Sequence, residues 1–476
     1  MMRILQFGFI SFFVFSLSIA QVDWSSNKKA IESSIKKHEK ALTKISDEIW
    51  SNAELALEEH KSSKILSDYA EKNGFNIERG VAGMPTAFIA TYGKGRPRIG
   101  ILGEFDANAG ISQKKQTTKE ALIEGAPGHG CGHNLYGTAS LGAAIAIKEL
   151  MKKGKIKGTI VFYGTPAEET IFGKVWFARA GLFNDLDVCM DWHPGDNLEA
   201  ATQSSKALID FRVKFSGSTA HASADPWNGF SAVDAMELFT TGINYYREHI
   251  KPTARIHYQI ESAGDVVNVV PDKAQIWVRI RENDRESLNV LYERVKKIAA
   301  AGALMAEVEH ELALISGIYE ILPNRRGAAI AQDNFKLMGP IKYTAKETKY
   351  AKEIQRETGK PELGMDGAIH PIRETLPAQG GSTDVGDVSQ LVPVVRLSAP
   401  AAPKDAPWHS WAVVACTGMS IGHKGMLYAS KALGMTMVDL YEDPQLIKEV
   451  TAEYKERKGS AKYKPMIPSG PPPVKK

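Results

Sequence analysis

Apolar and polar positions follow two different periods along the chain, and the period identifies the predicted elements. Residues 26–72 carry apolar positions at helical spacing. Short apolar runs follow at residues 98–102, 159–163 and 186–192, each ending in glycine or charged residues, and an alanine-rich helical stretch occupies residues 138–152. Strands that alternate with helices are typical of a mostly parallel α/β sheet.

A different order of elements begins near residue 203. The pattern predicts strands and helices in the order β-α-β-β-α-β, at residues 207–215, 231–248, 255–261, 274–281, 286–305 and about 308–315. This order describes a small ferredoxin-like α+β domain. Because the α/β pattern resumes near Asn324, we predict one α/β domain in two parts, 21–204 and 319–460, interrupted by an inserted domain at 205–318.

The two ends of the chain differ from the rest. A basic start, an apolar run at residues 7–17 and small residues at Ser18 and Ala20 predict a signal peptide at 1–20, cleaved near Ala20, and hence export. The alternative is an uncleaved membrane anchor, although the run is short for a bilayer span. Residues 461–476 are rich in proline and lysine, which predicts a disordered tail.

Composition narrows the class of protein. The 476 residues include 43% hydrophobic and 24% charged residues, as in an ordinary soluble protein of two or three domains. A net charge of +4 is too small to indicate a nucleic-acid or membrane partner. Three cysteines cannot form a disulfide framework in a chain of this length.

A glycine-rich segment, Gly-His-Gly-Cys-Gly-His-Asn at residues 128–134, carries the first candidate chemistry. Its glycines allow a tight turn, so that Cys131 and His133 can converge on one divalent metal ion. Two alternatives stay open: an exposed turn with no ligand, and a nucleophilic Cys131 paired with a histidine.

Two acidic residues, Glu168 and Glu169, follow the predicted strand at 159–163. Neighbouring side chains of an extended segment point in different directions, so Glu169 can bind a metal while Glu168 acts as a general base. An acidic pair on a solvated loop is the alternative.

Further polar residues follow other predicted strands. Asp106 and His193 each lie at the end of one, and His409 is a later candidate ligand. Open α/β sheets place their active sites at the C-terminal ends of the strands, so these groups are expected to meet. A metal that lowers the pKa of water, beside a carboxylate base, indicates a hydrolase; zinc and manganese both suit these ligands.

These motifs together resemble the M20 family of metallopeptidases and amidohydrolases, most nearly its aminobenzoyl-glutamate utilization protein B group. The resemblance covers about residues 27–442, and residues 381–389 are similar to a segment that marks the B group. It implies a zinc-peptidase-like catalytic domain interrupted by a lid and dimerisation domain, with two divalent ions, Zn or Mn, per subunit. The implied metal ligands are Cys131, His133, Glu169, His193 and His409, with Glu168 as the base.

The resemblance also assigns roles in the lid. It implies that His221 reaches the partner subunit's active site and stabilises an oxyanion, and that Asn268 contacts substrate. Arg281 is expected to hold a substrate carboxylate by a bidentate contact. A surface or capping histidine and a strand-end salt bridge are the respective alternatives.

One segment departs from the family pattern. Many M20 peptidases begin the site with His-x-Asp, where this chain has Glu104-Phe105-Asp106. The amidohydrolase branch uses Cys131 as a ligand instead, which leaves Asp106 to support a ligand from behind. The number of ions therefore stays open.

We therefore expect an exported, metal-dependent amidohydrolase that cleaves an N-acyl or N-aroyl amino acid, with p-aminobenzoyl-glutamate as the leading candidate. The alternatives are other N-acyl amino acids or dipeptides, a non-catalytic subunit of such an enzyme, and a cysteine hydrolase. The lid implies a homodimer, or a heteromer with a related subunit. No nucleic-acid or membrane partner is expected.

Overall fold

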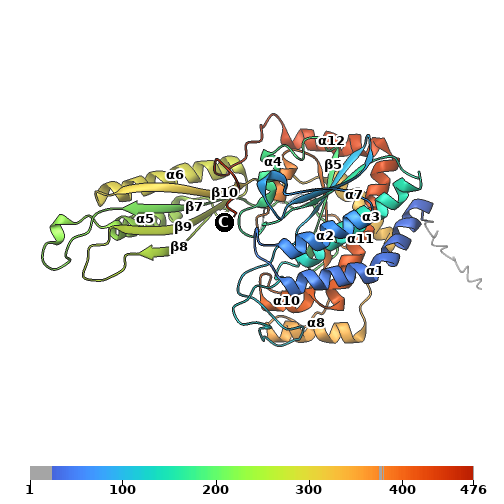
Figure 1. Cartoon of the computed structure of the whole chain (residues 1–476), viewed down its shortest axis with the longest axis horizontal. Coiled ribbons are helices and arrows are strands. Elements are labelled where there is room, and N and C mark those ends of the chain that lie inside the picture. The colour runs from blue at the N-terminus through green and yellow to red at the C-terminus, as the bar shows by residue number, and fades with distance from the viewer. Residues whose placement is uncertain (1–23, 375–377, 379, 475–476) are drawn as a thin grey trace, which may run out of the picture.

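The computed structural model describes residues 24–374, 378 and 380–474 of the chain, so the predicted signal peptide at 1–20 lies outside the described residues. An α/β main domain occupies one side of the molecule, and a smaller domain projects from it as an arm (Figure 1). Among the described residues, no helix has the length and apolar character needed to cross a membrane.

The main domain is built on a 7-stranded sheet in the order β1-β2-β4-β3-β5-β11-β6. Its central strands, β4, β3, β5 and β11, pair in parallel, and the edge strands β1, β2 and β6 are antiparallel. This arrangement confirms the predicted mostly parallel sheet. The strands are β1 (Asn76–Arg79), β2 (Phe88–Lys94), β3 (Arg98–Gly103), β4 (Gly158–Gly164), β5 (Val188–Gly195), β6 (Glu199–Ala200) and β11 (Val394–Pro400).

Helices cover this sheet. Helices α3 and α11 pack directly on its strands, and α1 packs on α3 and α11. The amphipathic stretch at residues 26–72 forms two helices, because Ala53 and Leu57 adopt left-handed backbone angles that turn the chain between them. The helices are α1 (Ser26–Asn52), α2 (His60–Lys72), α3 (His133–Lys152), α4 (Gly173–Arg179), α7 (Arg325–Met338), α8 (Ala345–Glu357), α9 (Val385–Ser389), α10 (Trp411–Thr417), α11 (Ser420–Glu442) and α12 (Pro444–Lys458), with a short 3₁₀ helix η1 (Val81–Gly83).

The projecting domain, here called the lid, has the ferredoxin-like order predicted from the sequence. Its 4-stranded sheet runs β10-β7-β9-β8 with every neighbouring pair antiparallel, and α5 and α6 pack on it. The elements are β7 (Ala207–Ser216), α5 (Ala232–Tyr246), β8 (Arg255–Ala263), β9 (Lys273–Glu282), α6 (Arg285–Met305) and β10 (Glu309–Ile318), with 3₁₀ helices η2 (Pro226–Asn228) and η3 (Arg247–His249).

Burial alternates along β9. Ala274, Ile276, Val278 and Ile280 are buried in the lid core, whereas the intervening side chains are only partly buried. Successive side chains of a strand point to opposite faces, so the arginines of this strand share the face away from the helices.

The C-terminal tail differs from the disordered segment that its composition predicts. The Met466 carbonyl accepts a 2.6 Å hydrogen bond from the Gly317 amide of β10, and the Tyr463 hydroxyl donates to Asp387. The Arg179 guanidinium of α4 donates to the carbonyl oxygen of Pro468 at 3.1 Å. The tail therefore contacts both domains where the lid joins the main domain, because apolar and aromatic residues are interspersed among its prolines and lysines.

Candidate metal centre

Loops at the C-terminal edge of the parallel strands bring the predicted ligands together. His133 begins α3, and Glu168 and Glu169 follow β4. His193 lies on β5, and His409 precedes α10. Positions far apart in the sequence thus meet at one edge of the sheet, as expected of residues that follow parallel strands.

Short distances define the centre. The Cys131 Sγ atom lies 3.5 Å from Nε2 of His193, and Nε2 of His133 lies 3.9 Å from Oε1 of Glu169. His409 Nε2 lies 3.6 Å from the other oxygen of Glu169. Potential ligand atoms form two sets, Cys131–His133–His193 and Cys131–Glu169–His409. Within each set, all ligand atoms lie within 4.8 Å of one another, and Cys131 belongs to both sets.

Unusual backbone angles place these side chains. Gly132 has a φ of 75°, in the left-handed region that glycine adopts readily, and this turn separates Cys131 from His133 at the start of α3. His409 has a φ of 57° and Ala167, next to Glu168, a φ of 64°. Such angles are costly for residues with a Cβ and cluster at functional sites.

Unpartnered buried atoms test whether the centre fits a metal. His133 Nε2, Glu169 Oε1 and Glu104 Oε2 are all buried and have no hydrogen-bond partner in the described structure. Leaving buried polar atoms without partners is costly, and these nitrogen and oxygen donors, with a cysteine sulfur beside them, form a suitable ligand set for a divalent ion. The residues present therefore fit the metal that the family implies.

Asp106 lies behind two of these residues. Its Oδ1 is 2.9 Å from Nδ1 of His133, and its Oδ2 accepts a 2.9 Å hydrogen bond from the Glu169 amide. These are the contacts expected of a carboxylate that orients a ligand histidine rather than binding the metal itself.

The other histidine of the glycine-rich segment, His129, points away from the centre. Its Nε2 lies 3.0 Å from the carbonyl oxygen of Ile49 in α1, and burial lowers its pKa to about 3. This side chain is a neutral donor to α1.

The surroundings of Cys131 bear on the alternative of a cysteine nucleophile. Burial and the nearby Glu169 carboxylate raise the pKa of the thiol, and a nucleophile must be a thiolate. Burial, Glu104 and Glu169 likewise raise the pKa of Glu168 well above its usual range. A cation among these carboxylates would oppose both shifts, so the arrangement favours a metal ligand over a free nucleophile.

A cavity of about 650 Å³ opens beside the centre, between the main domain and the lid. Cys131, Glu168 and His409 line it from the main domain, and Arg279 and Arg281 line it from β9.

The two lid arginines differ in their partners. Arg279 is paired with Asp210 at 2.5 Å, whereas Arg281 forms no ion pair in the described structure and its Nε has no hydrogen-bond partner. Burial and the neighbouring Arg279 lower the pKa of Arg281. This arrangement argues against a strand-end salt bridge and leaves Arg281 available to an anionic ligand.

The remaining lid residues predicted for the site lie elsewhere in this chain. His221 and Asn268 are exposed, do not line the cavity, and occupy neighbouring loops linked by a bridge between His221 and Val269. These loops follow β7 and β8, at the end of the arm remote from the main domain (Figure 1). Within one chain, therefore, they do not join the centre.

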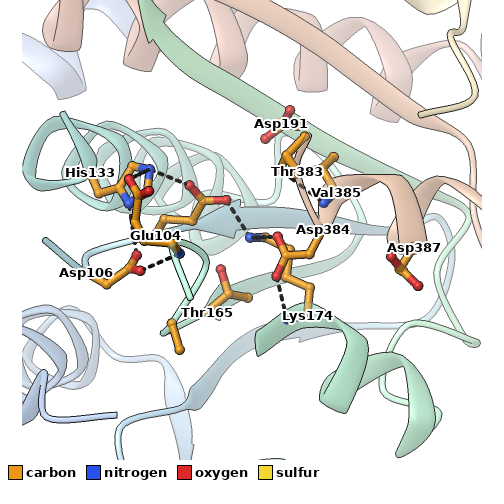
Figure 2. Close-up of polar contacts among 12 residues, drawn as sticks. Glu104, Asp106, His133, Thr165, Lys174, Asp191, Thr383, Asp384, Val385 and Asp387 are labelled. Carbon is orange, nitrogen blue, oxygen red and sulfur yellow. Dashed lines mark hydrogen bonds and ion pairs between the residues drawn. The ribbon is translucent and has the colours of Figure 1, made fainter. Parts of the chain in front are cut away.

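A buried charge network beside the centre was not predicted from the sequence. Lys174 of α4 is fully buried, and its Nζ lies 2.7 Å from Oδ1 of Asp384 and also contacts Oε1 of Glu104 (Figure 2). Asp384 lies in the 381–389 segment, which served only as a mark of the B group. The one sequence signal of this network was a lysine within an otherwise apolar helical segment. Lysine side chains are usually exposed, so this position does not by itself predict a buried charge.

A fold of this kind, with convergent Cys, His and Glu side chains that could bind a metal beside a general-base candidate, is that of a metal-dependent hydrolase. Comparison with known proteins agrees. Residues 203–305 match the family model of the M20 peptidase dimerisation domain. The chain is 35% identical to the B-type subunit of the p-aminobenzoyl-glutamate hydrolase of Escherichia coli K12, over 94% of this chain and 98% of the relative. This protein belongs to the M20 family of metallopeptidases and amidohydrolases.

Two further similarities, one of sequence and one of fold, were found. The human Xaa-Arg dipeptidase is 27% identical over 86% of this chain and 88% of its own length. The crystal structure of a dinuclear metal-binding M20 peptidase from Bacillus subtilis superposes with a TM-score of 0.57 at 17% identity, covering 86% of this chain and 99% of the other. The family, the fold and the class of enzyme predicted from the sequence are confirmed.

Proposed function

We propose that this enzyme hydrolyses the amide bond of an N-aroyl or N-acyl amino acid, with p-aminobenzoyl-glutamate as the leading substrate. The observation that carries the proposal is one cavity lined by four of the predicted ligands, by Glu168 and by Arg281, which forms no ion pair within the part of the chain that the structure describes. The four ligands are Cys131, Glu169, His193 and His409. In such a substrate, the scissile amide would lie at the metal centre beside Glu168, and the amino-acid carboxylate would face Arg281. The E. coli relative named as a hydrolase of this compound supports the choice.

The ligand set would hold the metal through Cys131, His133, Glu169, His193 and His409. When bound, a divalent ion polarises a carbonyl group and lowers the pKa of water. We propose two ions, zinc or manganese, because two groups of potential ligands share Cys131 and lie side by side.

Glu168 has the position of a proton carrier. It is buried on the cavity wall beside the ligand set, so it can take a proton from the attacking water and deliver it to the leaving amine. Arg281 would hold the carboxylate of the amino-acid half by two parallel hydrogen bonds, which orients the scissile amide toward Glu168.

A second chain completes this proposal. His221 and Asn268 lie on neighbouring lid loops outside the cavity of their own chain, so they would act in the site of a partner. A homodimer through the dimerisation domain supplies that partner, with His221 stabilising the oxyanion. A heteromer is the alternative, since the E. coli relatives are named as two different subunits of one hydrolase.

Another substrate class is a specific alternative, because the human relative is a dipeptidase named for arginine at its second residue. Hydrolysis of other N-acyl amino acids or of dipeptides would use the same centre.

We also propose that the enzyme acts outside the cytoplasm after cleavage near Ala20. Fractionation of cells and the N-terminal sequence of the mature protein test this proposal.

The deciding experiment measures release of p-aminobenzoate from p-aminobenzoyl-glutamate by the mature chain, with and without a chelator and beside Glu168→Gln. We expect chelation to abolish activity and Glu168→Gln to lower kcat by about 10²- to 10⁴-fold while bound metal is retained. Metal bound without this activity would redirect the search to other acyl amino acids. Activity that survives chelation would instead support the cysteine mechanism.

A further inference from the structure

We propose that Glu104 is a metal ligand, which binds through Oε2 the same ion as His133. The inference rests on the proposed metal centre but adds a residue that the family pattern does not supply. Glu104 is 1% exposed, and its Oε2 lies 3.0 Å from Nε2 of His133. Oxygen and nitrogen atoms of Glu104, His133 and Glu168 fall within 4.8 Å of one another.

The contact between Glu104 and His133 needs a positive charge, which a proton on His133 or a metal ion can supply. Asp106 can only accept at Nδ1 of His133, so Nδ1 carries a hydrogen, and in the neutral ring Nε2 presents its lone pair. That lone pair faces a carboxylate oxygen that has no hydrogen-bond partner of its own. Two electron-rich buried atoms this close repel each other unless a positive charge lies between them. A proton on Nε2 can supply that charge, and a divalent ion, which binds both types of atom, can replace that proton.

Glu104 cannot turn away from this contact. Its Oε1 is held by the ammonium of Lys174, which is itself held by Asp384 Oδ1 at 2.7 Å. The Lys174 amide also donates to the second oxygen of Asp384, at 2.8 Å. Figure 2 shows the resulting line from His133 through Glu104 and Lys174 to Asp384. Lys174 and Asp384 are thus positioning residues that aim the free oxygen of Glu104 at the centre.

The local charge is consistent with this role. Glu104, Asp106, Glu168 and Asp384 are all buried around the centre, and Lys174 is the cation that contacts two of them. Buried carboxylates need compensating positive charge to stay ionised, and one ammonium group does not suffice for four of them.

The first test uses the wild-type protein, so it does not depend on the folding of a variant. Crystals of the protein loaded with Zn²⁺, and separately with Mn²⁺, would locate each ion by anomalous scattering. We expect Oε2 of Glu104 at about 2.0–2.2 Å from an ion that also binds His133. An ion bound by Cys131, His133 and His193 with Glu104 more than about 3 Å away overturns this inference and leaves the proposed function standing. No ion at these residues overturns both.

The second test measures metal affinity rather than activity. Glu104→Gln keeps the shape of the side chain and its contact with Lys174, and we expect metal affinity to fall at least about tenfold. Asp387→Asn is the matched control, a buried carboxylate near Asp384 that contacts Tyr319 and Tyr463 instead of the centre. Calorimetric titration with Zn²⁺ compares them. Equal affinity for Glu104→Gln, Asp387→Asn and wild type would overturn the proposal.

Discussion

The Nδ1 atom of His133 donates a 2.9 Å hydrogen bond to Oδ1 of Asp106, so the histidine ring presents its other nitrogen to the centre. The second oxygen of Asp106 accepts from the amide of Glu169. One side chain therefore fixes both the tautomer of one predicted ligand and the backbone of another.

The substitution Asp106→Asn should weaken metal binding without removing a ligand. The amide side chain that it introduces no longer offers two acceptors, so either His133 or the Glu169 backbone loses its support. We expect the dissociation constant for Zn²⁺ to rise by about 10- to 100-fold. Competition with a chromophoric chelator measures the change, and an affinity equal to that of wild type would show that Asp106 does not orient the ligands.

Replacing Arg281 with methionine should separate substrate binding from chemistry. The substitution keeps an unbranched side chain but removes the donors that face the cavity, and a charge-assisted hydrogen bond contributes about 1.5–3 kcal/mol. We expect kcat/KM for p-aminobenzoyl-glutamate to fall about 10- to 100-fold. The control is a substrate whose α-carboxylate is replaced by an amide, for which wild type and Arg281→Met should differ little. A similar loss with both substrates would contradict a carboxylate contact.

Mixing two inactive variants should restore activity if His221 serves the partner's site. His221→Ala lacks the lid contribution and Glu168→Gln lacks the base, yet a mixed dimer contains one site with both residues intact. Random exchange of subunits should recover about a quarter of wild-type activity. The measurement follows activity after unfolding and refolding the two variants together. Recovery no greater than that of either variant alone would place His221 outside a shared site.

Asp387 should make stability fall as the pH rises. Burial raises the pKa of this carboxyl from 3.8 to about 7, so the folded state binds a proton more tightly than the unfolded state. The stabilising effect of that proton is complete below pH 3.8 and is lost as the pH rises through 7. The full pKa shift corresponds to about 4 kcal/mol in the free energy of unfolding. Asp387→Asn mimics the protonated acid at every pH.

Melting temperatures of wild type and Asp387→Asn between pH 4 and pH 8 test this reasoning. We expect the melting temperature of the wild type to fall by about 4 °C relative to that of the variant across this range. Parallel curves for the two proteins would mean that the folded state does not hold Asp387 protonated near neutral pH.

Much of the architecture follows from local pattern. The burial of alternate residues along β9 and the apolar runs of β3 and β4 are properties of short segments, so their periods identify them in the sequence. Because active sites of such sheets lie at the C-terminal ends of the strands, Glu168 and His193 can then be placed at one edge without knowledge of their contacts.

Other features depend on long-range packing and leave little trace in any one segment. Lys174 is buried only because Glu104 and Asp384, from segments distant in the sequence, meet it inside the protein. The tail after residue 460 has the composition of a disordered segment, yet the contacts of Tyr463 and Met466 hold it against the two domains. The composition of a segment is an average over its residues, so it does not reveal that one or two side chains bind the segment to the folded domains.

The insertion of the lid within the main domain has a consequence for the order in which the protein matures. All strands of the lid are contiguous in the sequence, whereas β5 pairs with β11, which is synthesised only after the whole lid. Domains form as units while the chain leaves the ribosome, so the lid can fold while one edge of β5 still lacks its neighbour. His409 emerges later still, and a nascent chain that stops before it would carry a folded lid beside a centre that lacks one of its predicted ligands.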